Sequence, residues 1–286
     1  MNYQGMNALI TGASSGLGEQ FAEQLARQGC NLVLVARSND KMNRLAESLR
    51  QRCHVEVNVI STDLSRAEAV HRLIADVKSR DVTIDLLVNN AGLGVFENFL
   101  DTSLERQLEQ IDVNVRALVA LTHAFAPAMV VAGRGGVINL ASNAGFQPLP
   151  GAAVYAASKA FVIFFSRGLA YELEKSKVRV TVVCPGPVAT AFFADKNPKL
   201  QPKQMDQPAA IVSEVLRAFA KGKKVVIPGK FSNRLSAFGV RFMPSPLIVR
   251  IAAGLVQQLN QKQVKCVISA RYGVVTNHLD QRNNAP

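Results

Sequence analysis

The sequence predicts an α/β protein with a doubly wound parallel sheet of about seven strands, followed by a C-terminal helical extension. Short β-branched runs alternate with longer helical patterns, which is typical of parallel strands joined by right-handed crossovers. Most of the runs are continuously apolar, as strands covered on both faces require. The 286 residues can fill one core, so we expect one α/β domain over 1–230, with 231–286 as its helical extension and tail.

The expected elements follow from these runs in chain order. The strand runs are 8–11, 31–36, 55–60, 85–89, 136–141, 178–184 and 224–228. The helical patterns cover 16–28, 38–51, 65–80, 103–131, 153–175 and 208–221. The longest irregular stretch, 192–207, contains Pro198 and Pro202 and is predicted to be a mobile loop.

The positive charge is concentrated near the C-terminus. The formal net charge is +12, but residues 1–194 hold 18 Lys/Arg and 17 Asp/Glu, whereas residues 195–286 hold 15 and 4. A nearly neutral body does not offer the basic surface that nucleic acids need, so we expect no nucleic-acid partner.

The four cysteines form neither a disulfide framework nor a metal-ligand spacing; they are Cys30, Cys53, Cys184 and Cys266. The chain opens without a basic flank and apolar core, and it has no stretch of about 20 uninterrupted apolar residues. We therefore expect reduced thiols, no metal site, no spanning helix and a cytoplasmic location.

A glycine-rich segment, Thr11–Gly18, follows the first strand run and opens the first helical pattern. Small residues let the backbone approach a pyrophosphate, and the helix N-terminus offers free N–H groups to it. The glycine spacing is G-x-x-x-G-x-G. A tight strand-helix connection is the simpler interpretation, but the strand-turn-helix context favours dinucleotide binding.

The second strand run ends in Ala36-Arg37-Ser38, where an acidic residue would bind a ribose 2′-hydroxyl and an arginine suits a 2′-phosphate. We interpret Arg37 as evidence for NADP(H), since its planar donors suit phosphate; the alternative is a solvated residue at a helix start.

Asp63, after the third run, either accepts from an adenine amino group or caps the next helix. Asn89–Gly92 end the fourth run with small and amide residues that suit a cofactor edge.

Tyr155 and Lys159 are four residues apart on one helical pattern and therefore share a face. An ammonium beside a phenol lowers the phenol's pKa, which suits a group that donates or accepts a proton. Ser142 ends the fifth strand run, and its hydroxyl can hold a substrate oxygen. Asn114 lies within an apolar helical pattern and needs a partner, for which a buried water is one candidate.

These segments together resemble the short-chain dehydrogenase/reductase family, in its compact single-domain branch, over about residues 6–228. The matching positions include the Thr11–Gly18 loop, Asn89–Gly92 and Pro185–Thr190, in family order. The resemblance implies a Rossmann fold and a proton-transfer set of Tyr155 as general acid or base, Lys159, Ser142 and Asn114. In this set Lys159 would hold the nicotinamide ribose and depress the Tyr155 pKa, Ser142 would orient the substrate oxygen, and Asn114 would support a water.

The resemblance also implies a cofactor site. Ser14 and Arg37 would meet the 2′-phosphate, Asp63 and Leu64 the adenine, Asn90 the adenosine side, and Val188 and Thr190 the carboxamide. The full set of implied cofactor-binding residues is Gly12, Ser14, Ser15, Gly16, Leu17, Gly18, Arg37, Asp63, Leu64, Asn90, Ala91, Gly92, Tyr155, Lys159, Pro185, Gly186, Val188 and Thr190. Cys184 is interpreted as a buried apolar residue rather than a nucleophile.

Two apolar helical patterns, 113–131 and 152–173, flank this site, and the second is apolar around most of its circumference. In the family these helices form an interface, so we expect a homodimer or homotetramer; sheet packing that uses all of this surface is the alternative. Phe192, Phe193, Leu200 and Met205 favour a hydrophobic carbonyl substrate without selecting one.

The stretch 235–259 is strongly apolar, with Arg234, Arg241 and Arg250 in or beside it. One interpretation is a helix pair packed on its own subunit or on a second copy. The other is an amphipathic segment on an anionic membrane, assisted by Lys221, Lys223, Lys224 and Lys230.

The sequence therefore predicts an NADP(H)-dependent oxidoreductase that moves a hydride between nicotinamide and a hydrophobic ketone, aldehyde, 3-oxoacyl or steroid-like compound, or the corresponding alcohol. The alternative from another class is a non-catalytic dinucleotide sensor or scaffold, which loss of Tyr155 or Lys159 would have favoured. A sugar-nucleotide epimerase is a second alternative, but the additional substrate domain and loop spacing of the extended branch are missing.

Overall fold

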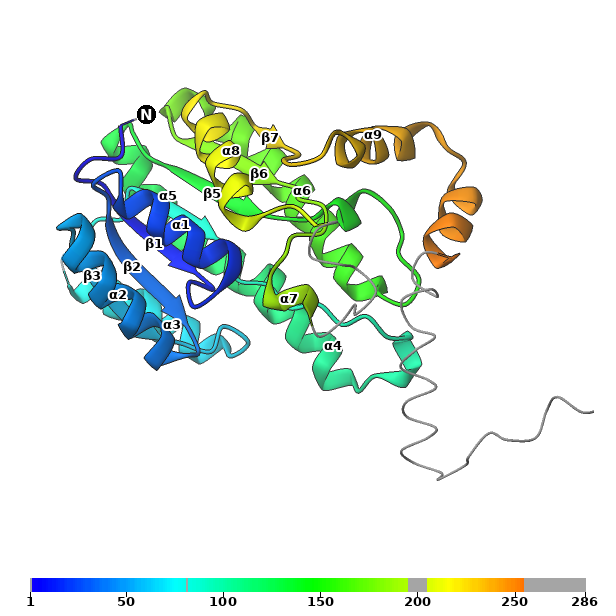
Figure 1. The fold of residues 1–286 in the computed structure, drawn as a ribbon, viewed down its shortest axis with the longest axis horizontal. Coiled ribbons are helices and arrows are strands. Elements are labelled where there is room, and N and C mark those ends of the chain that lie inside the picture. Colours follow the sequence, from blue (N-terminus) through cyan, green and yellow to red (C-terminus); the bar gives the residue numbers. More distant parts are fainter. Residues whose placement is uncertain (1, 81, 195–204, 255–286) are drawn as a thin grey trace, which may run out of the picture.

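The computed structural model describes residues 2–80, 82–194 and 205–254. It contains one seven-stranded sheet with helices on both faces (Figure 1). The strands are β1 (Asn7–Thr11), β2 (Asn31–Ala36), β3 (Val57–Ser61), β4 (Leu86–Asn89), β5 (Gly136–Leu140), β6 (Arg179–Val183) and β7 (Val225–Val226). The helices are α1 (Gly16–Ala26), α2 (Asn39–Cys53), α3 (Ala67–Ser79), α4 (Leu104–Ile111), α5 (Ala117–Ala132), α6 (Ala153–Glu172), α7 (Ala191–Ala194), α8 (Pro208–Ala220) and α9 (Phe231–Gly239).

Every neighbouring pair of strands is parallel, and the strand order is β3-β2-β1-β4-β5-β6-β7. The order reverses between β1 and β4, which are adjacent although β2 and β3 lie between them in the chain. In an open parallel sheet, this reversal leaves a crevice beyond the carboxyl ends of the strands. The predicted doubly wound α/β fold is confirmed.

The strands are continuously apolar because both faces of the sheet are buried under helices. Ile10 belongs to the core on the face covered by α1, α2 and α8. Leu9, one residue earlier, packs on the other face with side chains of α3, α5 and α6. Successive side chains of a strand point to opposite faces, so a strand buried on both sides has no polar face to show.

The expected strands 55–60 and 224–228 are found as Val57–Ser61 and Val225–Val226, and three further elements differ from the structure. The helical pattern at 103–131 contains a π-helical turn, Asp112–Arg116, between α4 and α5. The pattern at 153–175 ends at Glu172, and a 3₁₀ turn follows at Glu174–Ser176. The predicted loop at 192–207 overlaps helical turn α7, since Phe192 is helical. Most of that loop, 195–204, lies outside the described residues, so its predicted mobility stays a prediction.

Helices α4 to α5 (Leu104–Ala132) and α6 are long and apolar enough to cross a membrane by length and composition alone. Buried side chains of α5 and α6 pack on the sheet, as in the core helices of an α/β domain. Their composition is therefore accounted for by the fold, and the cytoplasmic location stays a prediction.

The C-terminal extension begins with α9, and a further helical segment covers 245–254. Figure 1 shows both projecting from one end of the sheet. Residues 255–286, which include Cys266, lie outside the described residues. The division of the chain at residue 230 stays a prediction.

The packing predicts that both faces of the sheet contribute to stability. Leu9→Ala and Ile10→Ala should each lower the free energy of unfolding by about 2–5 kcal/mol, because each leaves a cavity in a fully buried core. Leu100→Ala is the control, since Leu100 is 90% exposed, and it should change stability by less than about 0.5 kcal/mol. Urea unfolding of the three variants measures this; a core variant as mild as Leu100→Ala would contradict the two-sided packing.

Candidate active site

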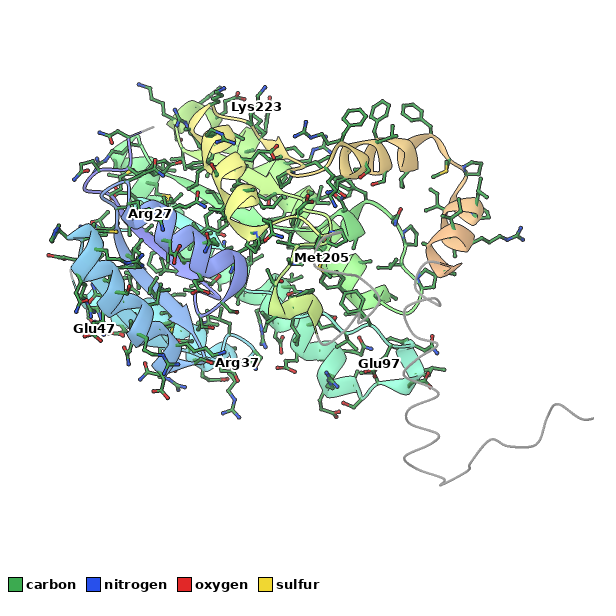
Figure 2. All side chains as sticks on the ribbon, in the orientation of Figure 1. Arg27, Arg37, Glu47, Glu97, Met205 and Lys223 are labelled. Carbon is green, nitrogen blue, oxygen red and sulfur yellow. The ribbon has the colours of Figure 1, made fainter. Side chains whose placement is uncertain are left out.

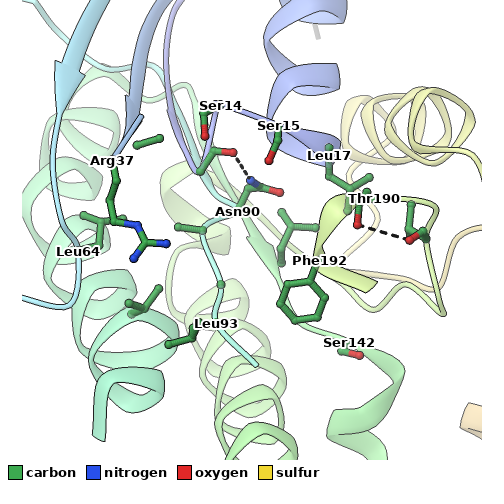
Figure 3. Close-up of a pocket in the computed structure, with 18 of the residues that line it drawn as sticks. Ser14, Ser15, Leu17, Arg37, Leu64, Asn90, Leu93, Ser142, Thr190 and Phe192 are labelled. Carbon is green, nitrogen blue, oxygen red and sulfur yellow. Dashed lines mark hydrogen bonds between the residues drawn. The ribbon is translucent and has the colours of Figure 1, made fainter. Parts of the chain in front are cut away.

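A cavity of about 320 Å³ lies at the reversal point of the sheet, beyond the carboxyl ends of β1, β2, β4 and β5. Arg37 lies toward one side of it, Asn90 near the middle, and Phe192 and Ser142 toward the other side (Figure 3). The cavity is lined by Gly12, Ser14, Ser15, Gly16, Leu17, Ala36, Arg37, Ser38, Thr62, Asp63, Leu64, Asn90, Ala91, Gly92, Leu93, Glu109, Val113, Leu140, Ala141, Ser142, Tyr155, Lys159, Pro185, Gly186, Val188, Thr190 and Phe192.

All but two of the predicted site residues line this cavity. Gly18 and Asn114 are the exceptions, and each lies behind its wall in contact with lining residues. A Cβ atom on Gly18 would stand 2.1 Å from the Gly12 carbonyl oxygen. The Asn114 side chain bonds the backbone of Leu93, which does line the cavity. The structure therefore brings together residues that come from six loops of the chain.

The glycine-rich loop is tied to the end of β4. The Asn90 Nδ2 atom donates to the carbonyl oxygens of Thr11, at 2.8 Å, and Gly12, at 3.3 Å. The Thr11 hydroxyl oxygen accepts from the backbone N–H groups of Asn90 and Ala91, both at 3.0 Å. These bonds connect two neighbouring parallel strands at the reversal point, so the loop has a fixed position there.

Two glycines of the loop occupy conformations that other residues avoid. Gly12 and Gly16 have φ values of +66° and +61°, in the left-handed region. A Cβ atom on Gly16 would come within 3.0 Å of the Thr190 side chain. The loop backbone therefore passes close to Thr190, and both residues line the cavity.

At the β2 end of the cavity, Arg37 is exposed and Asp63 faces it. The Asp63 carboxylate accepts from the backbone N–H and hydroxyl of Ser65, at 3.1 and 2.8 Å. Burial acts to raise the Asp63 pKa, but the Ser65 hydrogen bonds and the charges of Arg37 and Arg66 together hold it below its usual value. The carboxylate thus closes a local turn before α3, whose N-cap residue is Arg66 and which has no side-chain cap, so the predicted helix cap by Asp63 is wrong. Adenine contact stays a prediction.

Tyr155 lies in the first turn of α6 and is 5% exposed. Its ring lies 5.2 Å from the Phe96 ring and 6.0 Å from the Phe192 ring, measured between centroids. The Ser142 hydroxyl hydrogen-bonds the phenol group. Because burial destabilises the phenolate more than this bond stabilises it, the Tyr155 pKa is raised to about 12.

Lys159 lies one turn further along α6 and is also buried. Its Nζ atom donates to the Leu140 carbonyl oxygen at 2.9 Å and lies 5.9 Å from the Tyr155 ring centroid. Burial lowers the Lys159 pKa to about 8, against a small opposing effect of Cys184. Desolvation dominates both groups, so the net pKa of Tyr155 lies above its usual value, and the lowering effect expected of Lys159 stays a prediction.

Asn114 is held by the protein itself. Its amide exchanges two hydrogen bonds with the backbone of Leu93, both at 2.8 Å, and donates to the Ser158 hydroxyl at 2.9 Å. Ser158 in turn donates to the Tyr155 carbonyl oxygen at 2.7 Å. The side chain thus joins the π-helical turn to the loop after β4 and to the first turn of α6. Its predicted support of a water stays a prediction.

Several lining residues were not singled out from the sequence, among them Leu93, Glu109 and Val113. Leu93 follows the Asn89–Gly92 segment, whereas Glu109 and Val113 come from α4 and the π-helical turn. The carboxyl ends of neighbouring strands signal the loop after β4, but no local pattern shows that α4 reaches the cavity. Among the described residues, no group of three or more His, Cys, Asp or Glu side chains could hold a metal.

Cys184 lies at the end of β6 beside Lys159 and is fully buried. Burial raises the pKa of its thiol to about 12. A buried thiol with a raised pKa is a poor nucleophile, which agrees with its interpretation as an apolar packing residue.

The chain matches the family model for short chain dehydrogenases over residues 6–201. The oxidoreductase UcpA of Salmonella typhimurium is 35% identical over 219 residues, which cover 75% of this chain and 80% of that one. A short-chain dehydrogenase of Sphingobium yanoikuyae in complex with NADPH superposes with a TM-score of 0.74 at 34% identity, covering 82% of this chain and 93% of that one. The bulky-bulky ketone specific alcohol dehydrogenase of Comamonas testosteroni superposes with a TM-score of 0.73 at 28% identity, covering 99% of both chains.

The buried ammonium predicts a pH-dependent stability. The Lys159 pKa is about 8 in the folded chain and 10.5 ordinarily, so between these values the unfolded state binds more protons. The free energy of unfolding should therefore rise between about pH 8 and pH 10 relative to that of Lys159→Met, which has no titrating group. Urea unfolding of both chains over this range measures the difference. A constant difference would contradict the buried ammonium. Both chains contain Tyr155, so its titration largely cancels in the difference.

Proposed function

The chain belongs to the short-chain dehydrogenase family, and we propose that it transfers a hydride between NADP(H) and a hydrophobic carbonyl compound or alcohol. Its class, an oxidoreductase of this family, follows from the family match. One observation supports the finer reaction most: Tyr155, Ser142 and Lys159 line the same cavity as the glycine-rich loop and Arg37. A proton donor thus shares one cavity with a cradle for phosphate.

The residues present fit a dinucleotide. Gly12, Gly16 and Gly18 let the loop backbone pack closely against Asn90 and Thr190, where a Cβ atom would collide, and the N-terminus of α1 offers its free N–H groups to the cavity. Leu64, Ala91 and Val188 add apolar wall to the same cavity. A bound nicotinamide dinucleotide would supply or accept the hydride.

Arg37 supports NADP(H) rather than NAD(H). It directly follows β2 and lines the cavity together with Ser14, and neither Ala36 nor Ser38 carries the carboxylate that would repel a 2′-phosphate. The Sphingobium dehydrogenase binds NADPH, which agrees with this assignment.

Tyr155 suits the donor role in carbonyl reduction. Its pKa of about 12 keeps the phenol protonated at neutral pH, so the hydroxyl can give a proton to the substrate oxygen. Ser142 holds that oxygen beside the phenol. Lys159, fixed by Leu140, places positive charge below the ring and stabilises the phenolate that forms when the proton leaves. In alcohol oxidation the same proton would move the opposite way.

The substrate end of the cavity is apolar. Phe96 and Phe192 pack around Tyr155, and Leu93 and Val113 lie on the neighbouring wall. Aromatic and aliphatic walls favour a ketone or aldehyde with large apolar groups over a sugar. The similar alcohol dehydrogenase of Comamonas testosteroni is specific for bulky-bulky ketones, which agrees with this substrate class.

A non-catalytic dinucleotide sensor is the remaining alternative. It would have no need of a buried lysine beside a buried tyrosine, an arrangement that costs desolvation energy for both groups. Retention of Tyr155, Lys159 and Ser142 in one cavity therefore favours an enzyme.

The exposed apolar side chains of α4 and α6 support a homo-oligomer. Leu104 and Leu108 on α4 are exposed, and so are Phe161 and Phe164 on α6. Phe164 is 71% exposed in the single chain, so packing on the sheet does not use all of the apolar surface of α6. A second copy packed on this face would cover these residues.

Tyr155→Phe should reduce turnover of an accepted carbonyl compound by about 10²–10⁴-fold, because the proton donor is removed while the ring packing stays. NADPH oxidation in a panel of ketones, aldehydes and 3-oxoacyl compounds measures turnover, and NADPH fluorescence measures binding, which should be unchanged. Turnover near the natural level would show that Tyr155 is not the donor.

Arg37→Ala should reduce the preference for NADPH over NADH by about 10–100-fold, because one charged hydrogen-bonding group to the 2′-phosphate is lost. The matched control is Arg80→Ala, since Arg80 is paired with Asp76 and does not line the cavity. The ratio of kcat/KM for the two cofactors is the measurement. An unchanged ratio in Arg37→Ala would remove the basis for the cofactor assignment.

A further inference from the structure

The C-terminal extension carries an apolar face that points away from the protein. Phe231, Leu235, Phe238 and Phe242 recur at spacings of four, three and four residues, so they share one side of α9 and the turn after it. All four are exposed, and Phe231 and Phe242 are each 74% exposed. In Figure 2, aromatic side chains of this segment project together from the ribbon. We call these four residues the outer face of α9.

The opposite side of α9 is polar and faces the protein. Asn233 donates to the Asp206 carboxylate at 2.9 Å, and Arg234 bonds the Glu214 carboxylate at 2.6 Å and the Ile227 carbonyl oxygen at 3.0 Å. Ala237, on the same side, is buried. The phenyl rings therefore point outward, which is unusual for a surface helix in water, and the inner side of α9 holds Asn233 and the small apolar residue Ala237.

The helix is held in this orientation by the body of the protein. The Asn143 side chain donates to the Asn233 carbonyl oxygen at 3.3 Å, and a Cβ atom on Gly186 would stand within 2.6 Å of the Asn233 side chain. Gly186 lines the active-site cavity, so α9 is fixed beside that cavity. The contacts of Asn233 thus hold α9 in the orientation that turns its phenyl rings outward.

The segment that carries the outer face is strongly basic. Residues 221–254 contain seven Lys/Arg residues and no Asp or Glu. Lys224 pairs with Glu174 and Arg234 with Glu214. Lys221, Lys223 and Arg250 are exposed. Figure 2 shows Lys223 along the same edge of the molecule as α9.

The exposed phenyl rings and the basic charge of the segment together favour one kind of partner. An isologous contact with a second copy would bring two segments of the same positive charge together, which is unfavourable. Exposed phenyl rings on a segment that also carries the exposed cations Lys221, Lys223 and Arg250 match the interface of a bilayer with anionic lipids, where rings enter the acyl boundary and cations meet headgroups. We propose that the outer face of α9, with Leu247 and Ile251 of the following helix, docks on an anionic lipid bilayer.

Docking would place the active-site cavity next to the lipid. Leu247 and Ile251 extend the apolar surface along 245–254, and both are exposed. Because α9 contacts Gly186 at the cavity wall, a docked enzyme would take an apolar substrate from the bilayer. This consequence rests on the proposed function, whereas the docking itself does not.

Flotation of the full-length protein with vesicles tests the proposal. Vesicles of phosphatidylcholine mixed with phosphatidylglycerol should carry the protein upward, and vesicles of phosphatidylcholine alone should carry much less. Raising the salt from about 0.05 M to about 0.5 M should reduce flotation, because salt screens the attraction between cations and headgroups. Absence of flotation, or equal flotation with neutral vesicles, would overturn the proposal.

Phe231→Ser and Phe242→Ser should each weaken vesicle binding about tenfold, because each removes one buried phenyl ring from the membrane interface. Leu100→Ser is the matched control, since Leu100 is exposed and lies outside the extension; it should bind as the natural chain does. NADPH oxidation without vesicles should be unchanged in all three, which shows that the variants fold. If both Phe variants float normally, or if they instead abolish a dimer seen by light scattering, the outer face has another partner.

Discussion

The parallel direction of all seven strands is the constraint on which the rest of the structure depends. It places every strand's carboxyl end at one edge of the sheet, and the reversal between β1 and β4 opens the crevice there. The Asn90 side chain and the Thr11 hydroxyl then join the glycine-rich loop to the end of β4 across that crevice. Residues far apart in the chain meet in one cavity because their strands end together.

Burial is what makes the proton-transfer residues unusual. Tyr155 and Lys159 lie on one face of α6, against the sheet and beneath Phe96 and Phe192. Desolvation favours the neutral form of each group, so it raises the pKa of Tyr155 and lowers the pKa of Lys159. The tyrosine therefore keeps its proton, and the lysine holds its proton less firmly. These values suit a donor in carbonyl reduction. The same apolar enclosure is the reason that a hydrophobic substrate fits the site.

The C-terminal extension differs from the rest of the domain in where its apolar side chains lie. In the domain, apolar side chains fill the space between helices and sheet. In α9, hydrogen bonds of Asn233 and Arg234 occupy the inner side, and phenyl rings occupy the outer side. The segment that carries this outward face, residues 221–254, holds seven Lys/Arg residues and no Asp or Glu. Positive charge and exposed apolar side chains therefore occur on one segment, whose inner side contacts the cavity wall at Gly186.

The sequence by itself determined the sheet, the glycine-rich loop and the tyrosine-lysine pair, because strand burial, helix N-termini and a four-residue spacing are local patterns. Only the tertiary structure decided what those groups experience. It buried Tyr155 and Lys159 so deeply that desolvation has the largest effect on the Tyr155 pKa. It also let the Asn114 amide form hydrogen bonds with Leu93 and Ser158. It brought α4 to the cavity and turned the phenyl rings of α9 outward. Such outcomes depend on which distant surfaces meet, which no local pattern records.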